Sequence, residues 1–381
     1  MRLMPNTSHR TRFVFWWLAL INLFVGAMVG VERTVLPLAA EARFGSAFGA
    51  AAVGFVVAFS FAKATFNLLA GVAADRYGRR AVLLTGWAVM MPVPIMLAFA
   101  PSWSWVIAAN ILLGVGQAFT WSMTVNMMID VSTPDRRGYA AGINEFFGYG
   151  GVSLGAFGTG LLAAQLGLEP WPVLLGAAVA LVGLGLSLVV PETGDVTRPP
   201  PLAWVRGTGF PSVLGALTNM KDGAVWLAIP PLMAARGLSV AEIGLVAGLY
   251  PLVWAAGQPI FGPASDRHGR RPYLLGSLLL QAGGLAGLAV APTLVPALLA
   301  AVVLGLGTGM GYPVLIAWTV DRVAADRQAS ALGLYRFFRD GGYGAGALLL
   351  AVPFLAGPAT LWLLAGLLLL AGLALLQRRA V

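Results

Sequence analysis

A ten-residue loop occurs twice in this chain of 381 residues, first at Gly71–Arg80 and again, 191 positions later, at Gly262–Arg271. Both copies keep a glycine, an aspartate, an arginine, a second glycine and two further arginines at identical spacing. The same shift places many other residues on equivalents, such as Asp130 on Asp321. Such an uninterrupted repeat restricts the chain to folds that are built from two similar halves.

The composition places both halves in a membrane. Hydrophobic residues make up 59% of the chain, charged residues only 10%, and the mean hydropathy is +0.82. A chain of this composition cannot bury its apolar surface inside a water-soluble globule. Apolar spans of about 20 residues, enough to cross a bilayer as a helix, recur at 13–39, 47–74, 81–100, 103–130, 139–165, 171–190, 210–234, 238–264, 272–291, 294–320, 329–354 and 358–377. The sequence therefore predicts an all-α integral membrane protein with 12 transmembrane helices in two pseudo-symmetric six-helix bundles.

One polar, proline-rich segment, Pro191–Pro201, separates the two repeats. Polar segments rich in proline are typical of linkers between domains. The expected organisation is an N-terminal bundle at 1–190, a cytoplasmic linker at 191–209 and a C-terminal bundle at 210–381.

The positions of the basic residues predict the orientation of the chain. The formal net charge is +9, and the arginines gather at alternate turns between the expected helices. If the N-terminus lies inside, only Arg43 and Arg236 fall on the outer side. By the positive-inside rule, both termini are expected in the cytoplasm, in a multi-pass protein of the cytoplasmic membrane. This distribution explains the basic charge without a nucleic-acid partner.

Residue types that carry covalent or metal chemistry are scarce. The chain has no cysteine, and its two histidines, His9 and His268, lie in flanks of the apolar spans. No serine is placed beside a suitable base, so neither an enzyme nor a cofactor nor a metal site is expected. Met123, Met127 and Met128 are the one soft alternative, as thioether ligands for Cu(I), but core packing is the preferred interpretation.

The repeated loop resembles the signature of the major facilitator superfamily, which lies between the second and third helices of that family. This resemblance implies a cytoplasmic gate. In such a gate the aspartate lies near the start of a helix in the other half, and the second arginine bonds an acid that ends the fourth helix. The residues that match these positions are Gly71, Asp75, Arg76, Gly78, Arg79, Arg80 and Asp130 in the first copy, and Gly262, Asp266, Arg267, Gly269, Arg270 and Asp321 in the second.

The resemblance implies a secondary active transporter that moves a small solute by alternating access, as a monomer in the lipid bilayer. Protons are the expected driving ion and efflux the expected direction. Proton- or gradient-driven uptake of a nutrient or metal ion is the alternative, and a receptor or scaffold without transport is a further one. Asn110 stands where many proton-linked drug exporters carry an arginine, and residues 148–155 lack the glycine-proline pair of those exporters. These departures disfavour a drug exporter.

Nine ionisable residues are expected within the helices. Each costs about 2.5–3.5 kcal/mol at a helix centre and therefore faces a partner or a cavity. The nine residues are Glu32, Arg33, Lys63, Glu145, Lys221, Asp222, Arg336, Arg339 and Asp340. Five bases against four acids favour an anionic or zwitterionic solute.

Several of these charges have expected roles. Glu145 is the leading candidate for the proton-coupling site, followed by Glu32 and Asp222, because burial and a nearby cation shift the proton affinity of a carboxyl group in opposite directions. Lys63 and Asp340 are expected to form an ion pair between the halves, because the second and eleventh helices of the family lie together. An Arg336–Asp340 pair within one helix is the alternative.

The first, fourth, seventh and tenth helices line the cavity in this family. Polar and aromatic residues of these helices that could contact the solute are Asn22, Asn110, Gln117, Trp121, Asn126, Asn219, Trp226 and Tyr312. The glycine-rich runs at 148–155 and 341–346 lie inside apolar spans, so we expect them to bring helix backbones close together.

Overall fold

The computed structural model describes residues 9–45, 49–133, 136–194, 208–323 and 328–377. Most of the expected linker, at 195–207, therefore lies outside the described residues, as do both extreme ends. The first half contains α1 (His9–Phe44), α2 (Ala50–Tyr77), α3 (Arg79–Met90), α4 (Val93–Ala98), α5 (Trp103–Asp130), α6 (Arg137–Leu166) and α7 (Trp171–Leu188). The second half contains α8 (Gly209–Ala235), α9 (Val240–His268), α10 (Arg270–Val290), α11 (Leu294–Asp321), α12 (Gln328–Leu350) and α13 (Pro358–Gln377).

The prediction of 12 spans is confirmed within these ranges, with two local differences. The third span consists of α3 and α4, which are separated at Met91 and Pro92, because proline lacks the N–H that would continue the helix. The eleventh span ends at Leu350 rather than at 354, and Pro353 begins a short 3₁₀ turn.

Ten helical spans among the described residues are long and apolar enough to cross a membrane by length and composition. These ten do not include α8 and α12. Both of these helices carry charges in their interiors: Lys221 and Asp222 on α8, and Arg336, Arg339 and Asp340 on α12. The two helices therefore place charge where a lipid-facing helix would not tolerate it.

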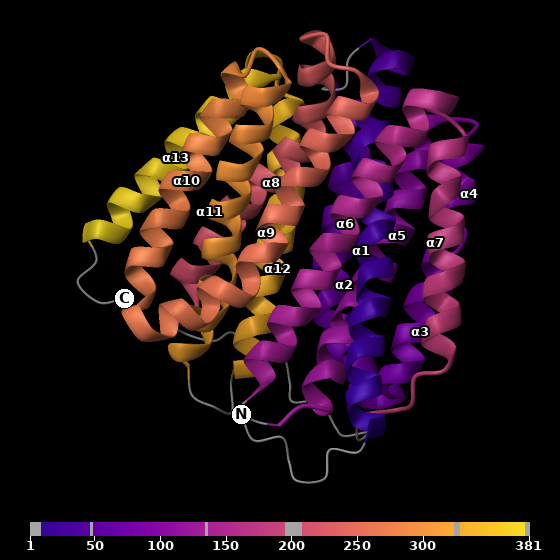
Figure 1. Cartoon of the computed structure of the whole chain (residues 1–381), viewed down its shortest axis with the longest axis vertical. Coiled ribbons are helices and arrows are strands. Elements are labelled where there is room, and N and C mark those ends of the chain that lie inside the picture. The colour runs from indigo at the N-terminus through magenta and orange to yellow at the C-terminus, as the bar shows by residue number, and fades with distance from the viewer. Residues whose placement is uncertain (1–8, 46–48, 134–135, 195–207, 324–327, 378–381) are drawn as a thin grey trace.

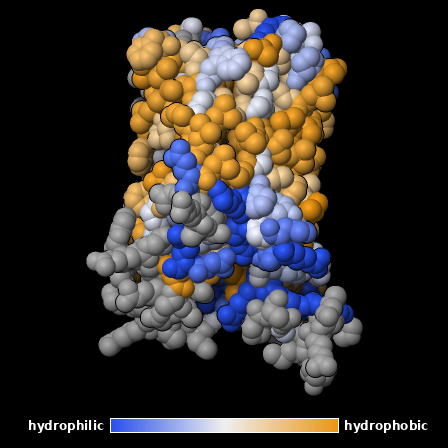
Figure 2. Space-filling view, turned by 90° about the vertical axis from the view of Figure 1, so that its left-hand side faces the viewer, coloured by the Kyte–Doolittle hydropathy of each residue, from blue (hydrophilic) through white to orange (hydrophobic). Residues whose placement is uncertain are grey.

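The two halves form two bundles that meet along their length (Figure 1). Across the boundary, α6 packs against α9 and α2 packs against α12. Because α3 and α4 together form the third span, α12 is the eleventh. The contact of α2 with α12 is therefore the contact between the second and eleventh helices that the family resemblance implied. Figure 2 shows one face of the molecule, on which apolar side chains form a broad band and hydrophilic side chains gather toward one end.

Glycines permit the close approach of helices within each half. A Cβ atom on Gly151 of α6 would lie 1.9 Å from the carbonyl oxygen of Leu23 on α1. At the equivalent place in the second half, a Cβ on Gly342 of α12 would lie 2.4 Å from the carbonyl oxygen of Ala216 on α8. The packing role expected of the glycine-rich runs is confirmed, because no larger residue fits these contacts.

Each repeated loop is bonded to the end of the last helix of its own half. The Arg80 side chain donates at 2.8 Å each to the carbonyl oxygens of Leu188, the last residue of α7, and of Val190, two residues later. Its equivalent, Arg271, donates to the carbonyl oxygen of Leu376 at the end of α13. Each loop is thus tied to the last helix of its own half.

Candidate functional site

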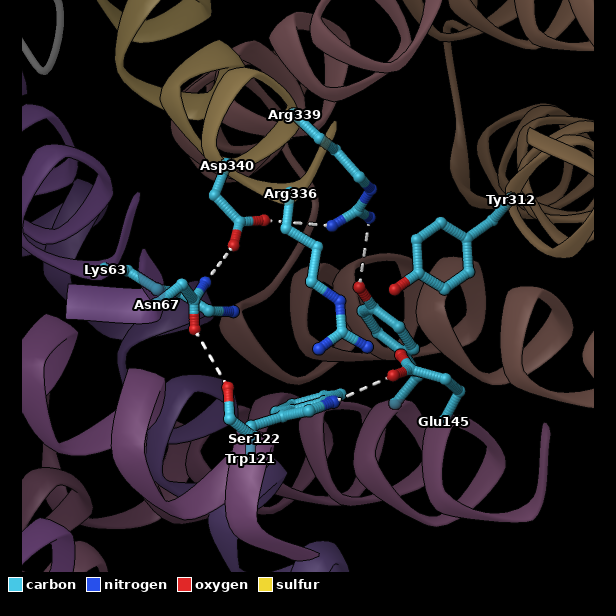
Figure 3. Close-up of a pocket in the computed structure, with 10 residues that line it drawn as sticks. Lys63, Asn67, Trp121, Ser122, Glu145, Tyr312, Arg336, Arg339 and Asp340 are labelled. Carbon is cyan, nitrogen blue, oxygen red and sulfur yellow. Dashed lines mark hydrogen bonds and ion pairs between the residues drawn. The ribbon is translucent and has the colours of Figure 1, made fainter. Parts of the chain in front are cut away.

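A polar pocket lies between the two halves and encloses about 330 Å³. Side chains from both halves meet in it (Figure 3). The first half contributes Lys63, Asn67, Trp121, Ser122, Glu145 and Tyr149, and the second half contributes Tyr312, Arg336, Arg339 and Asp340. Seven of these ten residues were expected from the sequence as intramembrane charges or solute contacts: Lys63, Trp121, Glu145, Tyr312, Arg336, Arg339 and Asp340.

Helical spacing explains two of the three pocket residues that were not expected from the sequence. Asn67 lies one turn after Lys63 on α2, and Tyr149 lies one turn after Glu145 on α6, so each shares a face with a charged neighbour. Ser122 follows Trp121 on α5 and donates to the Asn67 side chain at 3.2 Å. Reading residues four positions from each intramembrane charge would have found Asn67 and Tyr149.

Asp340 is held by partners from both halves. Its carboxylate accepts from the Arg339 guanidinium at 3.1 Å and from the Asn67 amide of the first half. The Ser60 hydroxyl of α2 donates to the Asp340 carbonyl oxygen at 2.6 Å. These contacts fasten α12 to α2 at the pocket.

The expected ion pair of Lys63 with Asp340 does not form among the described residues. The Lys63 ammonium lies instead 5.1 Å from the centre of the Trp121 ring and 5.7 Å from that of Phe59. The alternative pair of Arg336 with Asp340 is also absent from the described contacts, because Arg339 is the arginine that pairs with Asp340. An aromatic face attracts a cation without supplying a counter-charge, so Lys63 has no carboxylate partner among the described contacts.

Glu145 occupies the opposite side of the pocket from Asp340 (Figure 3). One carboxylate oxygen accepts from the Trp121 indole N–H at 3.0 Å, and the other has no protein partner although the residue is buried. The Arg336 side chain extends from α12 toward Trp121 and Glu145 (Figure 3). A carboxyl group with one open oxygen and an arginine on the same pocket wall can accept a further partner.

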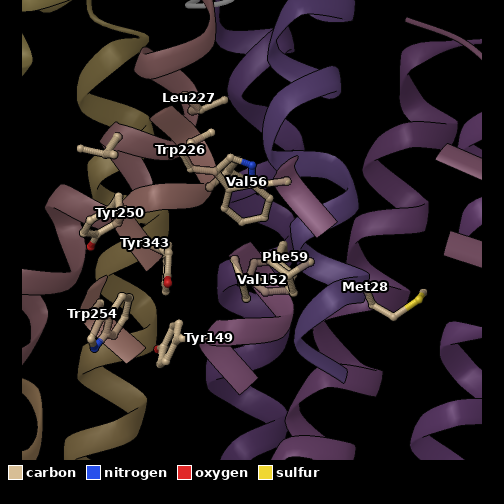
Figure 4. Close-up of a cluster of buried hydrophobic side chains, with 14 of the residues drawn as sticks. Met28, Val56, Phe59, Tyr149, Val152, Trp226, Leu227, Tyr250, Trp254 and Tyr343 are labelled. Carbon is tan, nitrogen blue, oxygen red and sulfur yellow. The ribbon is translucent and has the colours of Figure 1, made fainter. Parts of the chain in front are cut away.

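Aromatic rings from both halves form one wall. Tyr149 of α6 stacks on Trp254 of α9 with 3.6 Å between ring centroids, and the two lie side by side in Figure 4. The Arg339 guanidinium donates to the Tyr149 hydroxyl at 3.2 Å and lies 4.2 Å from the centre of the Tyr312 ring. Arg339 thus joins the aromatic wall to the charged side of the pocket.

The remaining intramembrane charges lie outside this pocket. The Lys221 ammonium pairs with the neighbouring Asp222 carboxylate inside the second half. Arg33 lies 4.9 Å from the centre of the Trp226 ring and donates to the Tyr343 hydroxyl at 3.4 Å. Glu32 is buried, and neither of its carboxylate oxygens has a protein partner.

Three of the other six expected solute contacts hold helices together. Asn22, Gln117 and Asn219 each donate to a backbone carbonyl oxygen of a neighbouring helix, at 2.6 Å for Asn22 and 2.7 Å for Asn219. Asn110 donates to a carbonyl oxygen of its own helix at 3.1 Å. Asn126 lies on α5 outside the pocket lining. Trp121 and Tyr312 are the two of the eight that line the pocket.

The first gate loop is connected to the segment after α7. Arg79 donates to the Asp130 carboxylate at 3.1 Å, the contact that the family resemblance implied, and lies 3.9 Å from Asp75. The carboxylate of Glu192 accepts from the backbone N–H groups of Arg79 and Arg80 at 3.0 Å each. No contact of Asp75 with a helix start in the other half occurs within the described ranges.

The Glu192 carboxylate has a shifted proton affinity. Partial burial alone would raise the pKa of Glu192, but hydrogen bonds from the backbone N–H groups around it outweigh burial and lower the pKa. These donors stabilise the ionised form at the start of α3, where the helix dipole also favours negative charge.

The contacts of Arg270 in the second repeated loop are made within its own half. Arg270 contacts Asp321 at 3.1 Å and also pairs with Asp266. It donates in addition to the Ser265 hydroxyl at 2.7 Å. A groove beside this loop is lined by Trp318 and Arg322 together with the loop residues.

No group of three or more His, Asp or Glu side chains that could hold a metal ion occurs in the part of the chain that the structure describes. Met123, Met127 and Met128 belong to the buried apolar core of the first half.

Two membrane-spanning bundles around a shared polar pocket define a membrane transporter of small solutes. The family model described as Major Facilitator Superfamily matches residues 14–210 and 211–380, and the chain belongs to this family. An uncharacterised MFS-type transporter of Salmonella typhimurium is 26% identical over 360 residues, which cover 89% of each chain. The uncharacterised MFS-type transporter YddS of Bacillus subtilis is 24% identical over 354 residues, which cover 82% of this chain and 78% of YddS.

Solved structures show the same fold. The nucleoside transporter NupG superimposes with a TM-score of 0.77 at 14% identity, over 95% of this chain and 99% of that chain. The human organic anion transporter MFSD10 superimposes with a TM-score of 0.73 at 18% identity, over 97% of this chain and 100% of that chain. At these identities the likeness extends to the fold alone.

Proposed function

We propose that this transporter moves a small solute that bears an anionic group across the membrane, and that it uses the proton gradient with Glu145 as the coupling residue. The solute binds in the pocket between the halves, and the halves rock about it to expose it to either side. The proposal includes a monomer in the cytoplasmic membrane with both termini in the cytoplasm. The repeated loops act in it as the cytoplasmic gate.

The charge balance of the pocket supports an anionic group. Arg339 and Asp340 neutralise each other, and Lys63 and Arg336 then face Glu145 as the one remaining acid of the lining. When Glu145 is protonated, two cations remain without a counter-charge in a site of low polarity, where an anion gains strongly from both. The two solved neighbours are named for a nucleoside and for an organic anion, and the second class agrees with this charge balance.

The single observation that carries the coupling proposal is the position of Glu145 in the same pocket as Arg336, with one carboxylate oxygen unpartnered. An ionised Glu145 attracts Arg336 and competes with an anionic solute for that arginine. Protonation removes the competition, so proton binding and solute binding are linked. Because the proton and the anion then bind together, an inward proton gradient drives uptake through this step. Uptake, the alternative to the export expected from the sequence, is therefore the direction that this linkage favours.

Transport in liposomes tests this proposal. Small carboxylates that stabilise the purified protein in a thermal-shift screen provide the solute. We expect Glu145→Gln to abolish proton-driven accumulation but to retain solute counterflow, because the binding cations remain. Glu169→Gln, which changes a partly exposed ion pair with Arg43 outside the pocket, is the matched control. Uphill transport by Glu145→Gln at the rate of Glu169→Gln would contradict the role of Glu145.

A further inference from the structure

A second, small polar cavity adjoins the pocket inside the second half. Its lining consists of Thr218, Asp222, Gln281, Thr308, Gly311, Tyr312 and Arg339. Tyr312 and Arg339 also line the central pocket, so the two spaces share a wall. The proposed function does not use this cavity.

The cavity offers hydrogen-bond acceptors and few free donors. The hydroxyl groups of Thr218 and Thr308 donate to backbone carbonyl oxygens of their own helices, at 3.0 and 2.8 Å. The Gln281 amide N–H donates to the Ser277 hydroxyl at 2.7 Å, while its carbonyl oxygen is buried without a partner. The hydroxyl oxygens and the amide oxygen therefore retain lone pairs for a donor.

Asp222 adds a carboxylate that is only partly used. The contacts from the Lys221 ammonium and the Tyr250 hydroxyl both fall on the same oxygen, Oδ1. Lys221 also donates to the Tyr250 hydroxyl at 2.6 Å, which keeps the ammonium on that side of the carboxylate. An ionised carboxylate accepts about four hydrogen bonds, so its second oxygen can receive a donor from the cavity.

Arg339 is the cationic residue of the cavity wall, and its charge is already committed. Its guanidinium donates to the Asp340 carboxylate at 3.1 Å and to the Tyr149 hydroxyl at 3.2 Å, both outside the cavity lining. The two adjoining spaces thus have opposite preferences. The central pocket favours an anion beside Lys63 and Arg336, and the inner cavity favours a hydrogen-bond donor beside Asp222.

From this juxtaposition we infer that the solute is a zwitterion. Its anionic group binds between Lys63 and Arg336, and its ammonium group reaches past Tyr312 to the free oxygen of Asp222. This inference rests on the proposed function and names the substrate class of the same site. An inner cavity that contains the Asp222 carboxylate disfavours dicarboxylates, because a second carboxylate would be repelled by Asp222 and would face the acceptor oxygens around it.

Equilibrium binding to the purified full chain tests the inference without any gradient. The test compounds are linear amino acids with the amine on the terminal carbon, namely aminobutyrate, aminohexanoate and aminooctanoate. The matched controls are hexanoate, hexylamine and the dicarboxylate adipate. We expect the best of the three amino acids to bind at least about tenfold more tightly than hexanoate, because one charge-assisted hydrogen bond to a buried carboxylate is gained.

Two variants assign this gain to the inner cavity. Asp222→Asn should bring the affinity ratio of amino acid to hexanoate close to one. Thr308→Val retains every charge, and we expect it to lower the same ratio by a few-fold, which keeps the test open if the Asn variant folds poorly. Equal binding of adipate and the best amino acid, an undiminished ratio in both variants, or no binding of any of the three amino acids would each overturn the inference. A failure of Glu145→Gln to uncouple transport would leave these binding ratios unchanged, so the two proposals fail separately.

Discussion

The two gate loops share their key residues, yet the structure uses them differently. In the first loop, Arg79 and the start of α3 are tied to Asp130 and to Glu192 of the segment after α7. In the second loop, Arg270 is held by acids of its own half, and a Cβ on Gly269 would meet nothing within 4 Å. The same key residues at the same spacing therefore take part in two different sets of contacts.

The difference teaches that a repeated motif conserves a local geometry and leaves its partners free to diverge. Both glycines before α3 and α10 have φ +86° and ψ 154°, and both following arginines contact the acid that ends the neighbouring helix. Among the described residues, only the first loop is bonded by a carboxylate of the segment that leads to the second half, that of Glu192. This contact ties the proposed gate of the first half to the start of the linker.

The acids that end α5 and α11 should give the largest contrast between the copies. The Asp130 side chain is 18% exposed and that of Asp321 is 53% exposed. We expect Asp130→Asn to lower the free energy of unfolding by about 1.5–3 kcal/mol, the range for a charge-assisted hydrogen bond. Asp321→Asn should cost less than about 1 kcal/mol, as exposed pairs do. Thermal unfolding of both variants in detergent measures the contrast, and equal losses would contradict it.

The two loop glycines provide a second, smaller contrast. Alanine at either position must adopt a backbone conformation that costs about 1–3 kcal/mol for residues with a side chain. At Gly78 the added Cβ would also lie 2.6 Å from a carboxylate oxygen of Glu192, whereas Gly269 has open space. We expect Gly78→Ala to lower the unfolding temperature more than Gly269→Ala does. Adding Glu192→Ala, which removes the carboxylate group, should reduce the extra loss if the contact with the linker causes it, and an unchanged difference would refute that cause.

The smallest effect should come from Glu192 itself, and it should depend on pH. Because the folded state lowers the pKa of Glu192, the contact stabilises the protein above the ordinary pKa of a glutamate and is lost as the pH falls through the lowered value. Glu192→Gln should therefore unfold at a lower temperature than the wild type near neutral pH. The gap should close in acid. A gap that is constant over this range would show that the carboxylate charge is not responsible.

The architecture could be predicted from the sequence because the length of each apolar span and the repeat of the loop can both be seen without knowing any tertiary contact. The apolar spans place the helices within a few residues of their observed bounds. The spans at 210–234 and 329–354 contain charged residues, and the corresponding helices α8 and α12 are the two that length and hydropathy alone do not identify as membrane-spanning. Pro92 shows the limit of that reading. This proline interrupts the third span because it has no N–H to continue the hydrogen bonding of α3, and the apolar run around it gives no sign of the break.

The pocket was predicted less well because charge alone does not choose a partner. Lys63 and Asp340 lie on adjacent helices as expected, but Asn67 and Arg339 are closer to the carboxylate and satisfy it first. Asn22, Gln117 and Asn219 illustrate the opposite error. A buried amide on a cavity helix is as useful for holding a neighbouring backbone as for binding a solute, and only the geometry separates the two roles.

The lining of the pocket is divided between the halves, with Glu145 and Lys63 from one and Arg336 and Asp340 from the other. The residues that line the pocket therefore depend on both bundles, although the close glycine contacts that pack each bundle lie within that bundle. A natural or engineered exchange of one half with that of a relative would keep both scaffolds and create a new set of solute contacts at their boundary. A fold made of two similar bundles can therefore change the residues of its central pocket without a change in either scaffold.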